Sequence, residues 1–372
     1  MQIYLTQTGD TLPALARRFR TEAAALARLN QLSDPQNLTP GLALLIPGSE
    51  AAPTQGLEIS AGIAPGFPAG LQQELHSALS FACLYGSSLE KEGLSVPPDC
   101  RGLSQAARTE GALPLLALSS GGDAALIHRL LTGAETAAAF FESLTPALEN
   151  SGCQGLYLSL EALYPFDREA LAAFLEKLAD RLHRQGAFLM TALPPLGQTA
   201  REPLLRYGLE PLLHGAPADR VVLLGYGWGD PQSPPQPTAP LDRLRAALDG
   251  LPSSLPPEKL LLGLSVYGCR WTVPWQPGNP GRALPHTAAV DLAVACGAQV
   301  QLSRAAMASC FRFVDDLGLS QQVWFEDVRS FQARLELVRE YGLAGVHIWT
   351  ANRLCRPLMP LLQSRFSPEK YA

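Results

Sequence analysis

The residues with the clearest chemical pattern are residues 155–161, which read Gly-Leu-Tyr-Leu-Ser-Leu-Glu. Apolar and polar side chains alternate with a period of two. In a β-strand the leucines would therefore face one side, and Tyr157, Ser159 and Glu161 would face the other. If this strand belongs to a barrel of alternating strands and helices, Glu161 stands at the C-terminal rim, where such barrels carry their active sites. A carboxylate there predicts a proton donor or acceptor.

The same pattern has a second interpretation. A half-exposed antiparallel sheet also alternates in this way, and Tyr157, Ser159 and Glu161 would then be hydrated surface side chains. Because short motifs match by chance, the strand alone does not separate the two interpretations. The surrounding elements have to decide.

Those elements favour the barrel. Beyond residue 56, apolar runs and helical patterns alternate as a (β/α)8 barrel of the α/β class requires. The expected strands are residues 57–63, 79–85, 113–118, 155–160, 188–193, 221–226, 260–266 and 345–349. The helical patterns between them are residues 69–78, 104–110, 135–150, 167–184, 241–248 and 331–341. The alternative is a doubly wound open sheet, but Gly121 and Gly122 lack the spaced third glycine of its phosphate-binding turn.

One connection is too long for a barrel loop. Between the seventh strand and the last helix, residues 267–330 contain a helical pattern near 287–296. They also contain a predicted hairpin with strands at 310–314 and 321–325 and a turn around Asp315, Asp316 and Gly318. We expect a small α+β insertion at about residues 268–330, which forms one wall of a cleft beside the C-terminal face.

The first 48 residues have a different organisation, namely strand, helix, helix and strand. Residues 3–7 and 43–46 read as strands, Thr11 can cap the first helix, and the second helix follows Thr21 and ends near Asn30. Such a unit is marginal in size unless it is well packed. Residues 49–56 have the composition of a linker. The expected domains are therefore 1–48, a linker at 49–56, and the barrel at 57–372.

Composition excludes several classes of protein. The chain has 372 residues, 47% of them hydrophobic, and a formal net charge of -5, so no basic stripe predicts nucleic acid as a partner. The seven cysteines form no Cys-x-x-Cys pair and the six histidines show no metal-ligand spacing, so we expect neither a metal nor another cofactor. We expect a monomer made in the cytoplasm, with no signal peptide and no membrane span.

The N-terminal segment closely resembles a LysM module. The matching residues are Tyr4, Gly9, Asp10, Thr11, Leu12, Ala16, Phe19, Thr21, Leu26, Asn30, Leu38, Gly41, Leu44, Ile46 and Pro47. The resemblance implies a module that binds N-acetylglucosamine in peptidoglycan or chitin through a shallow groove. It nominates two segments as the sugar contacts, one formed by Gly9, Asp10, Thr11 and Leu12 and the other by residues 30–34, which begin with Asn30.

Residues from about Leu57 to Leu361 resemble glycoside hydrolase family 18, and most closely its bacterial branch of spore-cortex-lytic enzymes. The matching stretches are residues 155–161, 221–241, 259–282, 323–330 and 343–349. In that family Glu161 matches the glutamic acid that protonates the leaving oxygen, while the substrate's own acetamido oxygen attacks C1. Tyr226 matches the tyrosine that holds this acetamido group, and Trp349 matches the tryptophan beneath the reacting sugar.

Four more aromatic residues are candidate sugar platforms, because flat rings bury the apolar faces of sugars. They are Tyr267, Trp228, Trp271 and Tyr157, the last on the strand of Glu161. For each of them, packing in the protein core is the alternative.

Three positions depart from the family pattern. Ser159 stands where the family has an aspartate that orients the acetamido N–H and offsets the positive charge of the intermediate. Gly227 and Arg270 stand where relatives carry acidic residues. A serine can accept the hydrogen bond but cannot supply the charge, and loss of one preorganised electrostatic partner typically costs about 10² to 10³ in rate. We therefore expect a slow enzyme.

The expected function is hydrolysis of an N-acetylglucosamine-containing glycan, namely spore cortex peptidoglycan or its fragments. One alternative is a weakened or inactive family 18 protein that only binds glycan at the spore or cell wall. A second alternative is a chitinase. The resemblance also implies deposition around the forming spore, by a route other than ordinary secretion.

Overall fold

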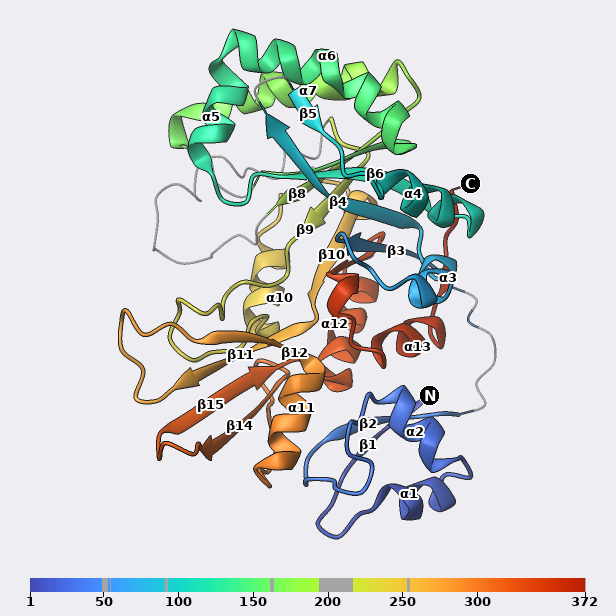
Figure 1. Cartoon of the computed structure of the whole chain (residues 1–372), viewed down its shortest axis with the longest axis vertical. Coiled ribbons are helices and arrows are strands. Elements are labelled where there is room, and N and C mark those ends of the chain that lie inside the picture. The colour runs from blue at the N-terminus through green and yellow to red at the C-terminus, as the bar shows by residue number, and fades with distance from the viewer. Residues whose placement is uncertain are drawn as a thin grey trace.

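The computed structural model describes residues 1–48, 53, 55–90, 93–160, 164–193, 217–252 and 255–371. It contains a small N-terminal domain, a parallel barrel and an α+β insertion, and the N-terminal domain lies against both the barrel and the insertion (Figure 1). In the part of the chain that is described, no helix is both long enough and apolar enough to span a bilayer.

Eight parallel strands form the closed barrel. They are β3 (Gly56–Ile63), β4 (Phe81–Glu90), β6 (Leu113–Ser119), β7 (Gly155–Ser159), β8 (Phe188–Leu193), β9 (Arg220–Leu223), β10 (Leu260–Ser265) and β16 (Gly345–Trp349). Each strand pairs with the next in this order, and β16 pairs again with β3 to close the ring. The predicted barrel is confirmed, and both sheet alternatives are wrong.

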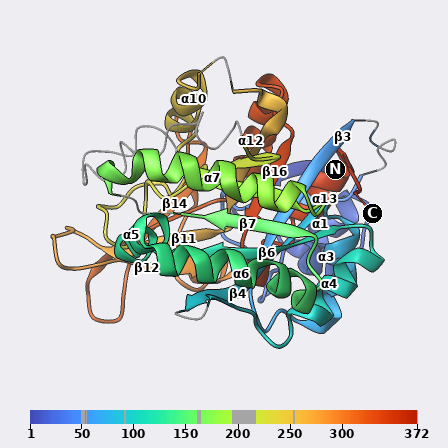
Figure 2. The ribbon, with the colours of Figure 1, turned by 90° about the horizontal axis from the view of Figure 1, so that it is seen from above.

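Helices cover the outside of this barrel. They are α3 (Ala69–Ser77), α4 (Cys100–Thr109), α5 (Ala124–Thr132), α6 (Ala134–Ser151), α7 (Arg168–His183), α10 (Leu241–Asp249), α12 (Val328–Glu340) and α13 (Leu358–Gln363). Figure 2 shows α6 and α7 over the outer side of β7. The sequence reading missed α5, which begins where Asp123 accepts a hydrogen bond from the Leu126 amide at 2.9 Å.

Two strands differ in length from the prediction. β4 continues past Tyr85 to Glu90, because its end pairs with the short antiparallel strand β5 (Gly93–Ser95). β9 ends at Leu223, three residues before the predicted end at Tyr226. Gly227, one residue beyond Tyr226, has a φ of +102°, so the backbone is not extended at that residue.

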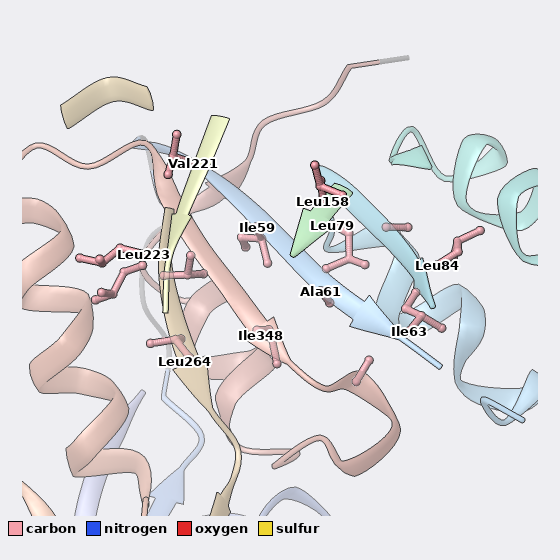
Figure 3. Close-up of a cluster of buried hydrophobic side chains, with 14 of the residues drawn as sticks. Ile59, Ala61, Ile63, Leu79, Leu84, Leu158, Val221, Leu223, Leu264 and Ile348 are labelled. Atoms are coloured by element: carbon pink, nitrogen blue, oxygen red, sulfur yellow. The ribbon is translucent and has the colours of Figure 1, made fainter. Parts of the chain in front are cut away.

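The barrel strands have two buried faces, which is why they read as nearly continuous apolar runs. One face packs beneath the helices and includes Ile59, Ala61, Ile63, Leu158, Leu264 and Ile348 (Figure 3). The other face fills the barrel interior with Phe81, Cys83, Tyr157, Met190 and Val222. Leu156, Leu158 and Leu160 belong to the outer cluster and Tyr157 to the inner one, so the predicted alternation along β7 is confirmed.

The N-terminal end of the barrel carries a charge cluster around the buried Glu58. The Glu58 side chain is 2% exposed and accepts a hydrogen bond from Arg220 Nε at 2.7 Å. Tyr371 contacts both residues through its hydroxyl, and its ring lies 4.8 Å from that of Phe81. Strand β17 (Ser367–Pro368) pairs with β3 and holds this tail in place. We call Glu58, Arg220 and Tyr371 the barrel floor.

The insertion is a five-stranded antiparallel sheet with one helix. The strands are β11 (Tyr267–Thr272), β12 (Arg282–Pro285), β13 (Gln301–Ser303), β14 (Ala308–Val314) and β15 (Ser320–Phe325), and the helix is α11 (His286–Ala295). The predicted hairpin corresponds to β14 and β15. The other three strands were not predicted, because two are very short and β11 mixes polar and apolar residues without alternation.

The N-terminal domain consists of β1 (Gln2–Leu5), α1 (Leu12–Arg18), α2 (Ala23–Leu29) and β2 (Ala43–Ile46), in the predicted order. Its core is continuous with that of the insertion, because Leu12, Leu26 and Leu44 belong to one buried cluster with Val290 and Phe325. Figure 1 shows α11 beside this domain. The shared core supplies apolar burial that so small a unit lacks alone.

Backbone contacts complete this interface. Thr39 Oγ1 donates to the Ala298 carbonyl at 2.7 Å, and the Val300 amide donates to the Pro40 carbonyl at 3.0 Å. Gly41 has a φ of +88°, and a Cβ there would lie 2.0 Å from the Val300 carbonyl oxygen. Only glycine fits this contact.

Candidate functional site

The C-terminal end of β7 brings the predicted catalytic segment to the barrel rim. Ser159 is the last residue of β7 and is 2% exposed, and its carbonyl accepts a hydrogen bond from the Ser120 amide at 3.0 Å. Glu161 lies outside the described residues and follows Leu160 directly in the sequence. Its role as the general acid therefore remains a prediction.

Trp349 occupies the corresponding end of β16. It is half-buried, and its ring centroid lies 4.7 Å from that of Tyr85 in an edge-to-face arrangement. Gly62 on β3 provides the space for both rings, because a Cβ there would lie 3.0 Å from Tyr85 Cε2 and 3.1 Å from Trp349 Cε3. The half-buried state leaves part of the Trp349 indole accessible, as a sugar platform requires.

Tyr226 follows β9 at the same rim and is also half-buried. Its ring packs against the backbone of β10, because a Cβ on Gly263 would lie 3.0 Å from Tyr226 Cε1. Gly227 comes next with its positive φ, a conformation that a side chain bearing Cβ rarely adopts. The departure from an acidic residue at 227 therefore agrees with the local backbone.

Tyr85 is the rim residue that the sequence reading missed. Burial raises the pKa of its hydroxyl well above the ordinary value, and Tyr157 and Tyr226 are among the groups that interact with it. The signal was present, because Phe81, Cys83 and Tyr85 alternate along β4 and so point to the barrel interior. We call Tyr85, Ser159, Tyr226 and Trp349 the rim cluster. None of these four side chains is charged at neutral pH.

Tyr157 lies deeper in the barrel. It is 1% exposed, and its ring stacks on that of His347 with centroids 5.2 Å apart. His347 Nδ1 is 2.9 Å from Ser60 Oγ, and burial lowers the pKa of His347 to about 3. Tyr157 therefore packs as a core residue beneath the rim cluster.

Two of the predicted tryptophan platforms are also buried. Trp271 is 1% exposed, and its indole N–H donates to the Ser233 carbonyl at 2.9 Å. Trp228 is 6% exposed and belongs to the outer core. The core-packing alternative describes both rings in this structure, and their contact with sugar remains only a prediction.

Tyr267 begins β11 and is half-buried, and burial raises the pKa of its hydroxyl. Arg270, on the same strand, is held by Gln321 Oε1 at 2.9 Å from its Nε, and it stacks over the Phe313 ring. The guanidinium is therefore part of the insertion sheet. Tyr267 stays a candidate for sugar contact.

The predicted sugar-binding residues of the N-terminal domain fall into two groups. Leu12 is fully buried, and Asn30 is 3% exposed, with its amide bonded to the backbone of Leu26 and Leu45. These two residues hold the fold together. Gly9, Asp10 and Thr11 form the turn before α1, where Asp10 accepts from the Gln7 amide and Thr11 caps the helix.

A groove runs beside the second nominated segment. It has a volume of about 760 Å³ and is lined by residues that include Leu12, Gln31, Leu32 and Ser33. Within the described ranges, no cluster of three or more His, Cys, Asp or Glu side chains could hold a metal ion.

Comparison with known families gives two matches. The model of glycosyl hydrolases family 18 matches residues 104–353, and the LysM domain model matches residues 4–47. The first match covers more than half of the chain and contains the barrel strands from β7 to β16. The second contains α1, α2 and β2 completely and the last two residues of β1.

Individual relatives cover almost the whole chain. The cortical fragment-lytic enzyme of Bacillus subtilis is 30% identical over 94% of this chain and 94% of its own length. The crystal structure of the Bacillus cereus spore cortex-lytic enzyme SleL is 26% identical, covers 100% of this chain and 88% of its own, and superposes with a TM-score of 0.78. The crystal structure of SleL from Bacillus megaterium is 24% identical and has the same TM-score, which shows the shared fold. The match covers 100% of this chain and 87% of the SleL chain.

Proposed function

The chain belongs to glycosyl hydrolase family 18, and from this premise we propose that it hydrolyses spore cortex peptidoglycan with Glu161 as the general acid. A LysM domain precedes the glycosidase barrel. The observation that carries the proposal is the alternation along β7, where Tyr157 lines the barrel interior two residues before Ser159 and four before Glu161. The two relatives named as cortex-lytic support the choice of substrate.

The proposed reaction needs one carboxyl group of the protein. Glu161 protonates the leaving glycosidic oxygen while the 2-acetamido oxygen of the sugar closes onto C1. Water then opens this intermediate as the Glu161 carboxylate takes up its proton. Tyr226 would hold the acetamido oxygen, and Trp349 would lie beneath the sugar ring with Tyr85 fixing the edge of its indole.

We propose that Ser159 makes this reaction slow. A serine hydroxyl can accept the acetamido N–H, but it leaves the positive charge of the intermediate without a carboxylate. Loss of one such preorganised group typically costs about 10² to 10³ in rate.

Ser159 also favours a second candidate function, namely a family 18 protein that binds glycan without cleaving it. Gly227 and Arg270 add to this case, because neither supplies the acidic group of relatives. A chitinase is the third candidate, since N-acetylglucosamine is common to both polymers. We further propose that the chain acts as a monomer at the spore or wall, with domain limits at 1–48, 49–56 and 57–372.

Hydrolysis assays separate these candidates. We expect the parent to release reducing ends from purified cortex fragments faster than from chitin oligomers, and Glu161→Gln to lower the rate by about 10² to 10⁴. Glu336→Gln, an exposed change on α12, is the matched control and should keep the parent rate. Faster cleavage of chitin would support the chitinase. Tight binding with no hydrolysis by either protein would support the binding protein.

A further inference from the structure

Two cavities meet between the N-terminal domain and the barrel rim. The larger is the groove of about 760 Å³, which has Leu12 and residues 31–33 on one side. Its other side comes from the glycosidase part of the chain, through Thr287 and Asp291 of α11 and through Arg356. The smaller cavity, of about 280 Å³, shares Gln31, Thr287 and Arg356 with it. The two cavities therefore lie next to each other, separated by these three shared side chains.

The smaller cavity lies at the C-terminal face of the barrel. It is lined by residues 351–354, which follow Trp349 at the end of β16, and by Phe67 in the loop after β3. Both segments lie at the C-terminal ends of barrel strands. A ligand lying in the larger groove could thus extend toward the face that carries Trp349.

The junction of the two cavities is held in one geometry. Gln31 Nε2 donates to the Leu354 carbonyl at 3.2 Å, and Gln31 Oε1 accepts from the Arg356 amide at 2.8 Å. Ser33 Oγ donates to Asp291 Oδ2 at 2.9 Å across the larger groove. These bonds join the N-terminal domain to residues 354–356 and to α11, which form the opposite wall. The hydrogen bonds therefore fix the two walls relative to each other, so the groove is formed by the folded chain itself.

The charged side chains of the two cavities favour an anionic ligand. Arg28, Arg353 and Arg356 line them, against the carboxylates of Glu74 and Asp291. Asp291 already accepts the Ser33 hydroxyl, whereas none of the three guanidinium groups has an ion-pair partner among the described residues. Guanidinium groups bind carboxylates through two parallel hydrogen bonds. Peptidoglycan carries carboxylates on its peptide groups, and chitin carries none.

We propose that the LysM domain and the glycosidase domain form one shared groove that binds a carboxylate-bearing glycan strand. Arg356 supplies the charge from the glycosidase side, and the strand runs from residues 31–33 toward the barrel rim. The proposal rests on the proposed function, because it assumes a glycan substrate. It differs from a LysM domain that binds sugar alone in a shallow groove, because one wall belongs to the other domain.

Binding measurements on the full chain test this proposal. All proteins carry Glu161→Gln, and the probes are soluble peptidoglycan fragments and the neutral N-acetylglucosamine pentamer. Arg356→Gln keeps the backbone amide that bonds to Gln31. We expect it to weaken binding of the peptidoglycan fragments about tenfold, as for a lost charge-assisted hydrogen bond, and binding of the pentamer less than twofold. Arg353→Gln, at an exposed position, should act in the same direction with a smaller effect.

Arg312→Gln is the matched control, because Arg312 is exposed on β14 and lines neither cavity. Unchanged fragment binding in both Arg356→Gln and Arg353→Gln would overturn the shared groove. Equal weakening for the two probes would overturn the assignment to carboxylates. Hydrolysis by the parent chain with Glu161 intact is measured separately, so an inactive parent refutes the proposed function whatever the binding data show.

Discussion

The two ends of the barrel are built from different kinds of side chain. The floor pairs the buried Glu58 carboxylate with the partly exposed Arg220, and the Tyr371 hydroxyl bonds to both. The rim cluster exposes parts of Tyr226 and Trp349 and contains no charged side chain. Buried charges must be paired to be tolerated, whereas partly exposed rings can contact a ligand. The floor should therefore govern stability and the rim activity.

The largest effect is expected at the floor. Arg220→Leu leaves Glu58 buried without its guanidinium, so we expect the free energy of unfolding in urea to fall by about 3 to 5 kcal/mol. The matched control is Arg245→Leu, which breaks an ion pair whose side chains are 43% and 50% exposed, so it should lower the free energy of unfolding far less. Turnover by folded Arg220→Leu protein should equal that of the parent. Similar losses of stability in the two variants would contradict the contrast.

The rim should show the opposite behaviour. We expect Tyr226→Phe to lower the turnover number about 10²-fold, because the hydroxyl that holds the acetamido oxygen is lost, and to leave the melting temperature unchanged. Tyr341→Phe, which removes a hydroxyl bonded to Asp249 on the outer helices, serves as the control. A Tyr226→Phe protein that melts earlier but turns over normally would assign Tyr226 to stability.

Low pH should destabilise the folded chain through His347, which lies between the floor and the rim. Burial lowers its pKa to about 3 in the folded chain, against an ordinary value of 6.5. The unfolded chain therefore binds the proton first, so this contribution to stability is complete above pH 6.5 and is lost as the pH falls toward 3. The slope is about 1.4 kcal/mol per pH unit for one proton. His286, with a pKa lowered to about 4, and His76 act in the same direction.

Unfolding measured from pH 7 to pH 4 checks this expectation. His347→Gln should reduce the slope by about one proton, whatever it does to stability at pH 7. An unchanged slope would show that His347 does not titrate between the folded and unfolded chains.

The smallest effect concerns Ser159. We expect Ser159→Asp to raise turnover about tenfold, because the new carboxylate can offset the positive charge of the intermediate. Asparagine has nearly the size of aspartate but no charge, so Ser159→Asn should not raise turnover. If both variants are as slow as the parent, the low rate has another cause.

The sequence contained most of the barrel because its strands are buried on both faces. Each strand reads as an apolar run, and the alternation of Tyr157 with Leu156 and Leu158 identifies the inner face without any coordinates. The LysM domain was predictable for a similar reason, since all four elements carry local turn and capping signals. Strand ends were less predictable, because the end of β4 depends on its pairing with β5.

The contacts that complete the structure were not predictable from local patterns. Glu58 and Arg220 are 162 positions apart, and nothing near either residue indicates its partner. Trp271 looked like a sugar platform, but its N–H is satisfied by Ser233, which lies 38 positions away. The wall that α11 adds to the LysM groove likewise depends on how two domains pack. Periodicity describes one element at a time, so it does not contain such information.

The close approach of Gly41 to Val300 also bears on how such proteins could be recombined. Exchanging the LysM domain for another would require the donor domain to fit against the insertion. Here a donor module with any side chain at the position of Gly41 would collide with the Val300 backbone. A chimera would therefore need that glycine, or a compensating shift in the insertion, before the donor domain could pack against the insertion. In this chain, the need for a residue without Cβ at position 41 limits which LysM domains could be exchanged.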